Sequence, residues 1–419
     1  MSLQGPLIVV AEKPAADLVE ALSRAGAFPI VEATWADAPT AFVSVKPAAI
    51  VIAEPGAPPS ESASRMLCLQ AATATGPIVP IIARVDADND AAVPIALPND
   101  ATLPVGRLAA RLQSALRVRA LHATVLRRLE TFAGLGGEMP ALPTGDALDD
   151  ATVLIAGRGP LYPSLSVAMG ERVGMVGALS VEAAAKYLNS HDIDGIVVGD
   201  GFSPRMVEAF LTVLAQDTRF RDIPVAVIGE APPDFYDSLP NIDHVDADPA
   251  RLVARMVPLV RMHAFETRLK RMLKSLDAGG MFDPQTGLLT HEAFVRDLAK
   301  AISEASDRSQ PLSLARLAFA EPLDERASLD GARMVARLTR AIDFACQDDD
   351  GAVLIVFTQT DLQSAHVVAR RIAGVMKNVV VAQRGLSPTA EVTLATLKAG
   401  DTLESLLLRV LNREPVAAA

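Results

Sequence analysis

The chain has 419 residues, of which half are hydrophobic and 21% charged, so we expect a folded protein of two to four domains. Its formal net charge of −11 argues against nonspecific binding to nucleic acid or to an anionic membrane, which requires clustered Lys and Arg. The two cysteines, Cys68 and Cys346, provide neither a disulfide framework nor a zinc site.

The N-terminal segment MSLQGPLIVVAEK lacks a basic start followed by a long apolar run, so it does not resemble a signal peptide. No apolar segment reaches the length of a membrane span without a charge, proline or glycine. We therefore expect a cytoplasmic protein that binds neither nucleic acid nor membrane.

The first segment, residues 1–131, alternates short apolar runs with amphipathic helices, such as those predicted at 15–24 and 60–74. Strands are predicted at Leu7–Val10, Phe28–Val31, Ala49–Ala53, Ile78–Ile82 and Val93–Leu97. A long helix is predicted from Val105 to Thr131. This alternation predicts a doubly wound parallel sheet. Residues 132–150 are rich in Gly, Pro and Asp, which indicates a linker.

The second segment, residues 151–277, repeats the same rhythm. Strands are predicted at Thr152–Ala156, Val173–Val176, Gly195–Gly199, Val225–Ile228 and Ile242–Val245. A helix should run from Pro249 to Leu276. Its residues Phe265, Leu269, Met272 and Leu276 alternate spacings of four and three, as in a coiled coil. This apolar line either pairs two chains in a homodimer or packs on its own domain.

The third segment, residues 278–419, mixes hairpin and crossover elements and is predicted to be α+β. Helices are expected at 291–305, 331–341, 362–376 and 403–412, with a strand at 312–319 and a hairpin at 344–357. The Asp-Gly pair within the hairpin suits a tight reversal between strands.

The first two segments resemble the receiver domains of response regulators, which have a flavodoxin-like doubly wound fold. That resemblance implies an Asp phosphoacceptor after the third strand, an acidic pair for Mg²⁺ after the first, a Thr or Ser after the fourth and a Lys-Pro after the fifth. The metal and the Lys neutralise phosphoryl oxygens during transfer.

Both segments depart from that receiver pattern. In the first, Glu54 takes the acceptor position and Ala11-Glu12 replaces the acidic pair, so no phosphorylation is expected. In the second, Asp200 keeps the acceptor position, and Pro204 stands where the family has a proline. Its acidic pair, hydroxyl residue and Lys-Pro are replaced by Ala156-Gly157, Gly229 and Asp248-Pro249. We expect Asp200 to be an unused acceptor in a surface turn.

The segment MFDPQTGLLTHEAF, Met281–Phe294, resembles the D-P-L-T-G-L-x-N-R-x-x-F opening of GGDEF domains, the family of diguanylate cyclases. Six positions match: Asp283, Pro284, Thr286, Gly287, Leu288 and Phe294. Gln285, Thr290 and His291 depart from it. The resemblance extends to about Asn412 and implies a nucleotide-cyclase-like α+β domain.

The family's catalytic groups are missing from this domain. Ala318 and Ala320 occupy the places of two metal-binding carboxylates at the end of the first strand. The GGDEF signature reads Asp349-Asp350-Gly351-Ala352-Val353, so two carboxylates would repel the phosphates of GTP. We therefore expect no catalytic residue, no metal site, no required cofactor and no cyclase activity.

The family's inhibitory R-x-x-D site, by contrast, is retained. In Arg340-Ala-Ile-Asp343, the Asp stands six positions before Asp349, as the family pattern requires. Arg371 matches an additional Arg on the next helix. An Arg can bind guanine O6 and N7 or a phosphate oxygen, and an Asp can accept from guanine N–H groups. Arg340, Asp343 and Arg371 are the predicted cyclic di-GMP ligands.

The order of receiver, receiver and GGDEF domains resembles PleD-like response regulators, and the lost catalytic groups resemble the PopA-like branch. That resemblance implies a cyclic di-GMP effector in bacterial cell-cycle or developmental control, found at a cell pole, with protein partners such as proteolysis adaptors. The alternative is a scaffold or dimerisation protein, built from the same degenerate domains, that binds no nucleotide.

Overall fold

The computed structural model describes residues 4–53, 70–71, 76–85, 96–101, 104–137, 145–229, 235, 237–308, 310–320, 323–384, 390–411 and 416–417. Its contacts divide the chain into two compact units. Unit 1 comprises Met1–His122 and Leu142–Leu269, and unit 2 comprises Ala123–Ala141 and Lys270–Ala419. Two long helices, α4 (Val105–Gly134) and α8 (Pro249–Leu276), begin in unit 1 and end in unit 2.

Unit 1 contains two five-stranded sheets in which every strand pair is parallel. The first sheet has the order β2-β1-β3-β4-β5, with strands Gln4–Val10, Phe28–Ala33, Ala49–Ile52, Ile81–Val85 and Leu97–Asp100 for β1 to β5. The second has the order β7-β6-β8-β9-β10, with strands Thr152–Ala156, Gly174–Ala178, Gly195–Val198, Val225–Ile228 and Ile242–Val245 for β6 to β10. Both follow the 2-1-3-4-5 order of flavodoxin-like folds.

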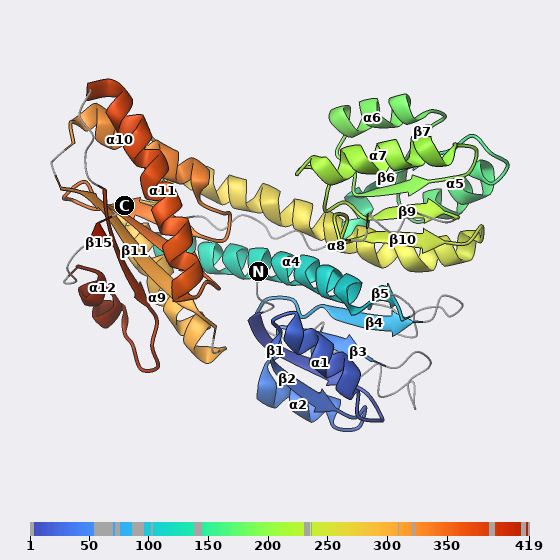
Figure 1. The fold of residues 1–419 in the computed structure, drawn as a ribbon, viewed down its shortest axis with the longest axis horizontal. Helices are drawn as coiled ribbons and strands as arrows, with labels where there is room; N and C mark the ends of the chain where they lie inside the picture. Colours follow the sequence, from blue (N-terminus) through green and yellow to red (C-terminus); the bar gives the residue numbers. More distant parts are fainter. Residues whose placement is uncertain are drawn as a thin grey trace. The chain divides into compact units, whose positions relative to one another are not determined.

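Helices cover both faces of each sheet because the strands are apolar on both sides. The first sheet carries α1 (Ala16–Arg24) and α4 on one face and α2 (Ala38–Val45) on the other. In the second sheet, α6 (Val181–Ser190) and α7 (Pro204–Gln216) cover one face, and α5 (Tyr162–Gly170) and α8 cover the other (Figure 1). The predicted parallel sheets are thus confirmed.

Unit 2 is built on an antiparallel sheet with the order β12-β13-β11-β14-β15. Its strands are Leu312–Phe319, Phe344–Gln347, Val353–Thr358, Ala390–Thr396 and Val416–Ala417 for β11 to β15. One face packs on α10 (Glu325–Leu338) and α11 (Leu362–Arg384). The remaining helices are α9 (His291–Asp307) and α12 (Leu403–Leu411). This arrangement confirms the predicted α+β class.

Several predicted boundaries were wrong, among them the end of α11, which lies at Arg384 instead of residue 376. β4 starts at Ile81 instead of Ile78, and β5 starts at Leu97, where the predicted strand ends. Helix α10 begins at Glu325, six residues before the predicted start, because the Asp324 carboxylate caps it by accepting from the Ala327 N–H at 2.7 Å. Glu54 and most of the helix predicted at 60–74 lie outside the described residues.

Helix α8 has partners within the chain over its first part and at Phe265, the first residue of its predicted apolar line. Leu259 belongs to the core of the first sheet, with Met262 packed against it, whereas Leu252 and Met256 belong to the core of the second sheet. The Phe265 ring meets His122 of α4 edge-on, with centroids 5.2 Å apart. Packing on its own chain therefore accounts for this part of α8, and pairing of two chains stays a prediction.

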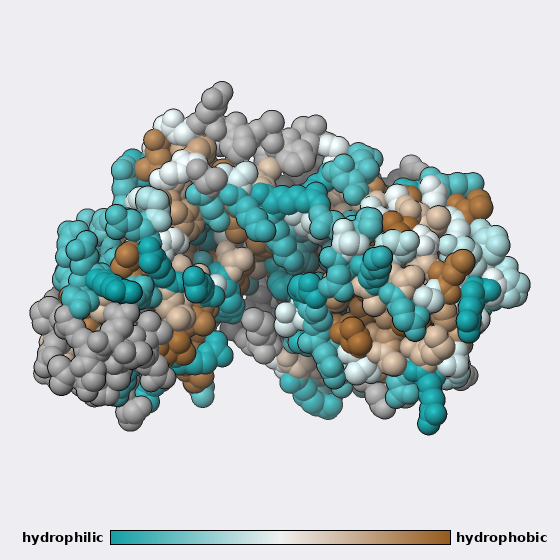
Figure 2. Space-filling view, turned by 90° about the horizontal axis from the view of Figure 1, so that it is seen from above, coloured by the Kyte–Doolittle hydropathy of each residue, from teal (hydrophilic) through white to brown (hydrophobic). Residues whose placement is uncertain are grey.

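The surface mixes polar and apolar residues. On the face that Figure 2 displays, apolar residues form separate small groups among polar ones. Exposed apolar side chains of unit 1 include Phe28, Val167 and Leu179. Among the described helices, none is long and apolar enough to cross a membrane.

Candidate functional site

The structure brings Arg340 and Asp343 together in the turn that joins α10 to β12. The N–H of Asp343 donates to the carbonyl of Arg340 at 3.0 Å, which closes the turn. The Arg340 Nε donates to Oδ2 of Asp343 at 2.8 Å. The two residues lie beyond the end of α10, not at a helix end as the sequence suggested, because α10 stops at Leu338.

The Asp343 carboxylate is fully engaged inside the domain. Its second oxygen, Oδ1, accepts from the backbone N–H of Thr358 at 3.0 Å, and only 1% of the side chain is exposed. Burial raises the pKa of Asp343 above its usual range, although the ion pair with Arg340 and the Thr358 hydrogen bond oppose this shift. The expectation that Asp343 accepts from guanine N–H groups is therefore not supported by this geometry.

Arg340 remains accessible while its orientation is fixed. Its side chain is 37% exposed. The Nη2 donates to Oγ1 of Thr360 at 3.0 Å, and that hydroxyl donates to the carbonyl of Thr358 at 2.8 Å. Among the described residues, Nη1 has no hydrogen-bond partner. The guanidinium thus retains N–H donors for a ligand, held in place by a buried carboxylate and a hydroxyl.

Sequence reasoning missed Thr358 and Thr360. A local signal could have found both: β13 ends at Thr358, and Thr360 lies in the short connection before α11 begins at Leu362. Two hydroxyl side chains thus occur where an antiparallel strand is followed by a helix. The Ser313 hydroxyl on β11 also donates to the Thr360 carbonyl at 2.9 Å, which ties this corner to the centre of the sheet. Hydrogen bonds therefore connect this corner to the sheet on its inner side.

The third predicted ligand, Arg371, is exposed on α11. Within the part of the chain that the structure describes, it forms no hydrogen bond or ion pair with Arg340 or Asp343. Its exposed neighbours one turn earlier and beside it are Val367 and Arg370. The structure joins Arg340 to Asp343, and Arg371 is a separate cation available on the surface of the same unit.

The hairpin that would carry the GGDEF signature forms a compact loop between β12 and β13. Gly351 adopts a φ of +82°, which favours glycine, and its N–H donates to the carbonyl of Asp348 at 2.9 Å. Asp350 forms an ion pair with Arg316 of β11. The prediction of a tight Asp-Gly reversal is confirmed.

Beside this hairpin, the described residues at the end of β11 include two alanines where the family has metal-binding carboxylates. Ala318 is buried near the end of β11, and Ala320 follows the strand. In the described ranges, no group of three or more His, Cys, Asp and Glu side chains is placed to hold a metal ion.

Asp200, the acceptor-position residue of the second sheet, follows β8 and is covered by the loop after β6. Its Oδ2 accepts from the N–H of Leu161 at 3.3 Å, and its Oδ1 is buried without a hydrogen-bond partner in the described part of the chain. A Cβ added at Gly159 would lie 2.1 Å from Oδ2. The loop therefore closes directly over the carboxylate, which is less exposed than the surface turn predicted. Glu54 of the first segment lies outside the described residues.

Comparisons with known proteins give only partial likenesses. No family model and no curated protein matches the chain. Among solved structures, it is similar to diguanylate cyclase SiaD in complex with its activator SiaC from Pseudomonas aeruginosa, with 22% identity over 34% of this chain and 62% of the other, at a TM-score of 0.29. It thus spans less than two thirds of that structure's length.

Two further similar structures are GGDEF domains. The coiled coil and GGDEF domain of DgcB from Caulobacter crescentus, in complex with c-di-GMP, is 20% identical over 34% of this chain and 83% of the other, with a TM-score of 0.29. The FimX GGDEF domain from Pseudomonas aeruginosa is 16% identical over 32% of this chain and 90% of the other, with a TM-score of 0.28. At these values no functional conclusion follows.

Proposed function

We propose that this chain is a non-catalytic cyclic di-GMP effector. In this proposal, residues 278–419 are a degenerate GGDEF domain, and residues 1–131 and 151–277 are degenerate receiver-type domains. Cyclic di-GMP binds at Arg340 with help from Arg371 and shifts the balance between associated states of the protein. The retained R-x-x-D register and the motif at Met281–Phe294 support this assignment.

The observation that carries the proposal is the state of the Arg340 guanidinium. A buried carboxylate and a hydroxyl fix it, yet its side chain is 37% exposed. A donor group that is already oriented loses little conformational freedom on binding, so each hydrogen bond it forms contributes more to affinity. The planar fork suits the O6 and N7 atoms of guanine or a phosphate oxygen.

In this proposal Asp343 positions Arg340, although the sequence predicted it to bind the ligand itself. Because both of its oxygens already accept hydrogen bonds, it orients Arg340 from below and does not touch the ligand. Arg371 adds an exposed positive charge, which suits a ligand that carries two phosphate groups. Cyclic di-GMP is a ligand here, and no cofactor is required.

We also propose that the domain does not cyclise GTP. Phosphoryl transfer of this kind depends on divalent ions held by carboxylates, and Ala318 and Ala320 stand at the two strand positions. In the hairpin, Asp349 and Asp350 add negative charge where the family approaches a triphosphate. A GTP turnover assay with Mg²⁺ should show no product, and measurable turnover would contradict this part of the proposal.

One observation favours a second candidate, a scaffold that binds no nucleotide. The Asp343 carboxylate is saturated, and two of the three nitrogens of the Arg340 guanidinium are also engaged, so the pair can be explained as a fold-stabilising contact. The receiver-type sheets would then act as protein-binding surfaces alone.

Calorimetric titration with cyclic di-GMP distinguishes the two candidates. The wild type should bind, and Arg340→Ala should bind at least about 10-fold more weakly, since a hydrogen bond to a charged group contributes about 1.5–3 kcal/mol. Arg371→Ala should also weaken binding, whereas Arg370→Ala, its exposed neighbour on α11, should not. No heat with the wild type, or equal binding by all variants, would favour the scaffold.

A further inference from the structure

Unit 1 contains the same local arrangement twice, a last strand followed by a long helix. Strand β5 precedes α4, and strand β10 precedes α8. The third and seventh residues of α4 are Arg107 and Arg111, and the third and seventh residues of α8 are Arg251 and Arg255. The matched arginine spacing indicates that the surface formed by β5 and α4 corresponds to the surface formed by β10 and α8 in two folds of the same kind.

The surface formed by β5 and α4 contacts the surface formed by β10 and α8 through a cluster of buried charged residues. Arg107 and Arg111 of α4 both form ion pairs with Asp243 of β10, and both donate to the carbonyl of Ile242. Arg111 also donates to the carbonyl of Pro98 on β5. The Asp243 side chain is 1% exposed. We refer to these three charged residues as the Arg107–Arg111–Asp243 cluster.

The reverse contact comes from α8. Its Leu259 is buried in the core of the first sheet, where it accompanies Leu97 of β5 and Leu112 of α4, and Met262 packs against the same core. Helix α4 therefore reaches the last strand of the second sheet, while α8 reaches the last strand of the first. Contacts in both directions between corresponding elements give the pair an approximate two-fold arrangement, although different residues make the two contacts.

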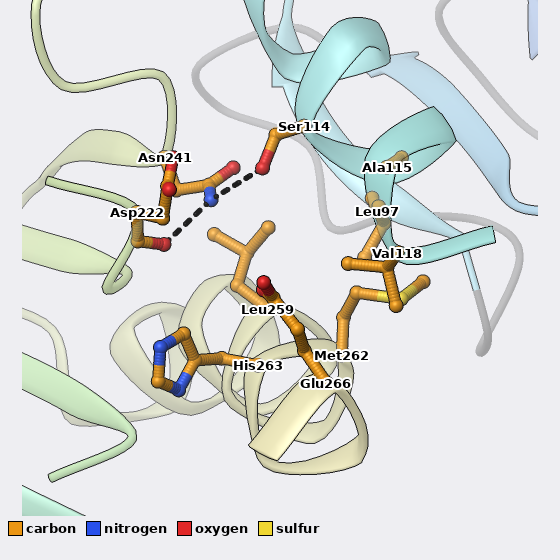
Figure 3. A pocket seen from close by; sticks show the side chains of 10 residues that line it. All are labelled: Leu97, Ser114, Ala115, Val118, Asp222, Asn241, Leu259, Met262, His263 and Glu266. Atoms are coloured by element: carbon orange, nitrogen blue, oxygen red, sulfur yellow. Dashed lines mark hydrogen bonds between the residues drawn. The ribbon is translucent and has the colours of Figure 1, made fainter. Parts of the chain in front are cut away.

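Polar contacts close the edge of this interface (Figure 3). The Asn241 Nδ2 donates to the Ser114 Oγ at 3.1 Å and to the Asp222 carbonyl at 3.0 Å. Arg117 pairs with the Asp222 carboxylate at 2.7 Å. The space enclosed by the side chains drawn in Figure 3 is about 10 Å³, which leaves room for one water molecule at most. The interface is closely packed at this edge, whereas a cavity of about 270 Å³, lined by Ile81, Leu97, Pro258 and Phe265 among others, lies between the same two parts elsewhere.

We infer that these two surfaces are partners of each other within one chain, as a pseudo-symmetric pair held by the Arg107–Arg111–Asp243 cluster. The surface that each sheet would offer to a second copy of the chain is therefore occupied in cis. Asp243 is the residue on which this pairing depends, because its loss leaves two buried guanidinium groups without their carboxylate, and breaking a buried pair from one side is strongly destabilising. This inference is independent of nucleotide binding.

The test compares Asp243→Ala with Asp246→Ala in the full chain. Asp246 lies three residues further on and pairs with Arg251 at 2.7 Å, but its side chain is 73% exposed, so its loss should have little effect. In Asp243→Ala, amide hydrogen exchange at 105–118 and 252–266 should rise about 100-fold. Light scattering should also show association above that of the wild type, because opening the pair exposes the apolar Leu97, Leu112 and Leu259.

A rescue variant distinguishes loss of the contact between the two surfaces from unfolding of the second sheet. Adding Arg107→Met and Arg111→Met to Asp243→Ala removes the buried charges, so exchange should return close to the wild-type rate. Where Asp243→Ala alone does not fold, the Arg107→Met and Arg111→Met pair, which leaves β10 unchanged, should show the same increases in exchange and association. Two results would overturn the inference: an amide exchange rate in Asp243→Ala equal to that of the wild type, or an exchange rate in the triple variant as high as in Asp243→Ala.

Discussion

Two regions of unit 2 pair arginine with a buried aspartate, but they differ in how much of the arginine is exposed. On α4, the Arg127 Nε donates to Oδ2 of Asp297 at 3.1 Å, and both side chains are buried. In the turn after α10, Asp343 is equally buried, whereas the Arg340 side chain is 37% exposed. The difference teaches that, of these two pairs, only Arg340 has a guanidinium that a ligand could reach.

Both aspartates accept from a second donor, but in the described part of the chain only the arginines of the buried pair also contact an aromatic ring. The Thr131 hydroxyl donates to Oδ1 of Asp297 at 3.1 Å. The Arg127 and Arg128 guanidinium groups lie 5.1 Å and 5.4 Å from the centre of the Phe344 ring. Phe344 directly follows Asp343, so this cluster also supports the strand that carries the candidate site. Its role is to stabilise unit 2.

The largest expected effect comes from removing the buried carboxylate. Asp297→Ala should lower the free energy of unfolding by about 3–5 kcal/mol, because Arg127 and Arg128 lose their shared buried partner. Denaturant unfolding of the full chain, followed at a probe in unit 2, measures this change. The control Glu292→Ala removes an exposed pair with Arg296 and should cost under about 0.5 kcal/mol. Similar losses of unfolding free energy in both variants would show that the buried Asp297 pair is not a special stabilising contact.

A smaller effect is expected from the titration of Asp343. Because its pKa is raised in the folded chain, the folded state holds the proton at a higher pH than the unfolded state does. The protonated group therefore contributes stability that is fully present below the unfolded pKa of about 3.9 and is lost as pH rises through the folded pKa.

Asp343→Asn cannot titrate and provides the comparison. The wild type should lose unfolding free energy relative to Asp343→Asn as pH rises from about 4 through the pKa of Asp343. Urea unfolding across this range, with ligand-free protein, measures the difference. A difference that stays constant with pH would show that burial does not perturb this carboxyl group.

The smallest effect should come from Thr360. Thr360→Val removes the acceptor of the Arg340 Nη2 and should weaken cyclic di-GMP binding by about 1 kcal/mol, since it loosens one side of the guanidinium. Thr360→Ser keeps the hydroxyl and should bind as the wild type does. Calorimetric titration of both variants with cyclic di-GMP measures the difference. An equal loss of affinity in both would show that the packing of the Thr360 side chain, not its hydrogen bond, supports binding.

The sequence predicted the elements with continuous apolar patterns best. Strands β6 and β9 begin and end where they were predicted, since runs of Val, Ile, Leu and Ala define them. The predicted bounds of β10, β11 and helix α8 are also correct, although polar or charged residues interrupt their apolar patterns. It placed β4 and the start of α10 wrongly, because a cap such as Asp324 is hard to distinguish from a loop residue in a polar stretch.

The candidate site was predicted only in part. Motif register identified Arg340 and Asp343 as neighbours, but sequence could not show that the carboxylate is buried or that Thr358 and Thr360 complete its surroundings. The buried arginines of α4 were missed for a related reason. Arg side chains are rarely buried unless paired, and the partners Asp243 and Asp297 lie far along the chain.

The most direct test of the central claim is a hydrogen-exchange footprint of cyclic di-GMP on the full chain. The account predicts that ligand slows exchange in the turn at 339–343 and along α11 at 366–374, and that Arg340→Ala abolishes this protection. Protection confined to unit 1, or no protection at any ligand concentration, would contradict the assignment of Arg340 as the nucleotide-binding group.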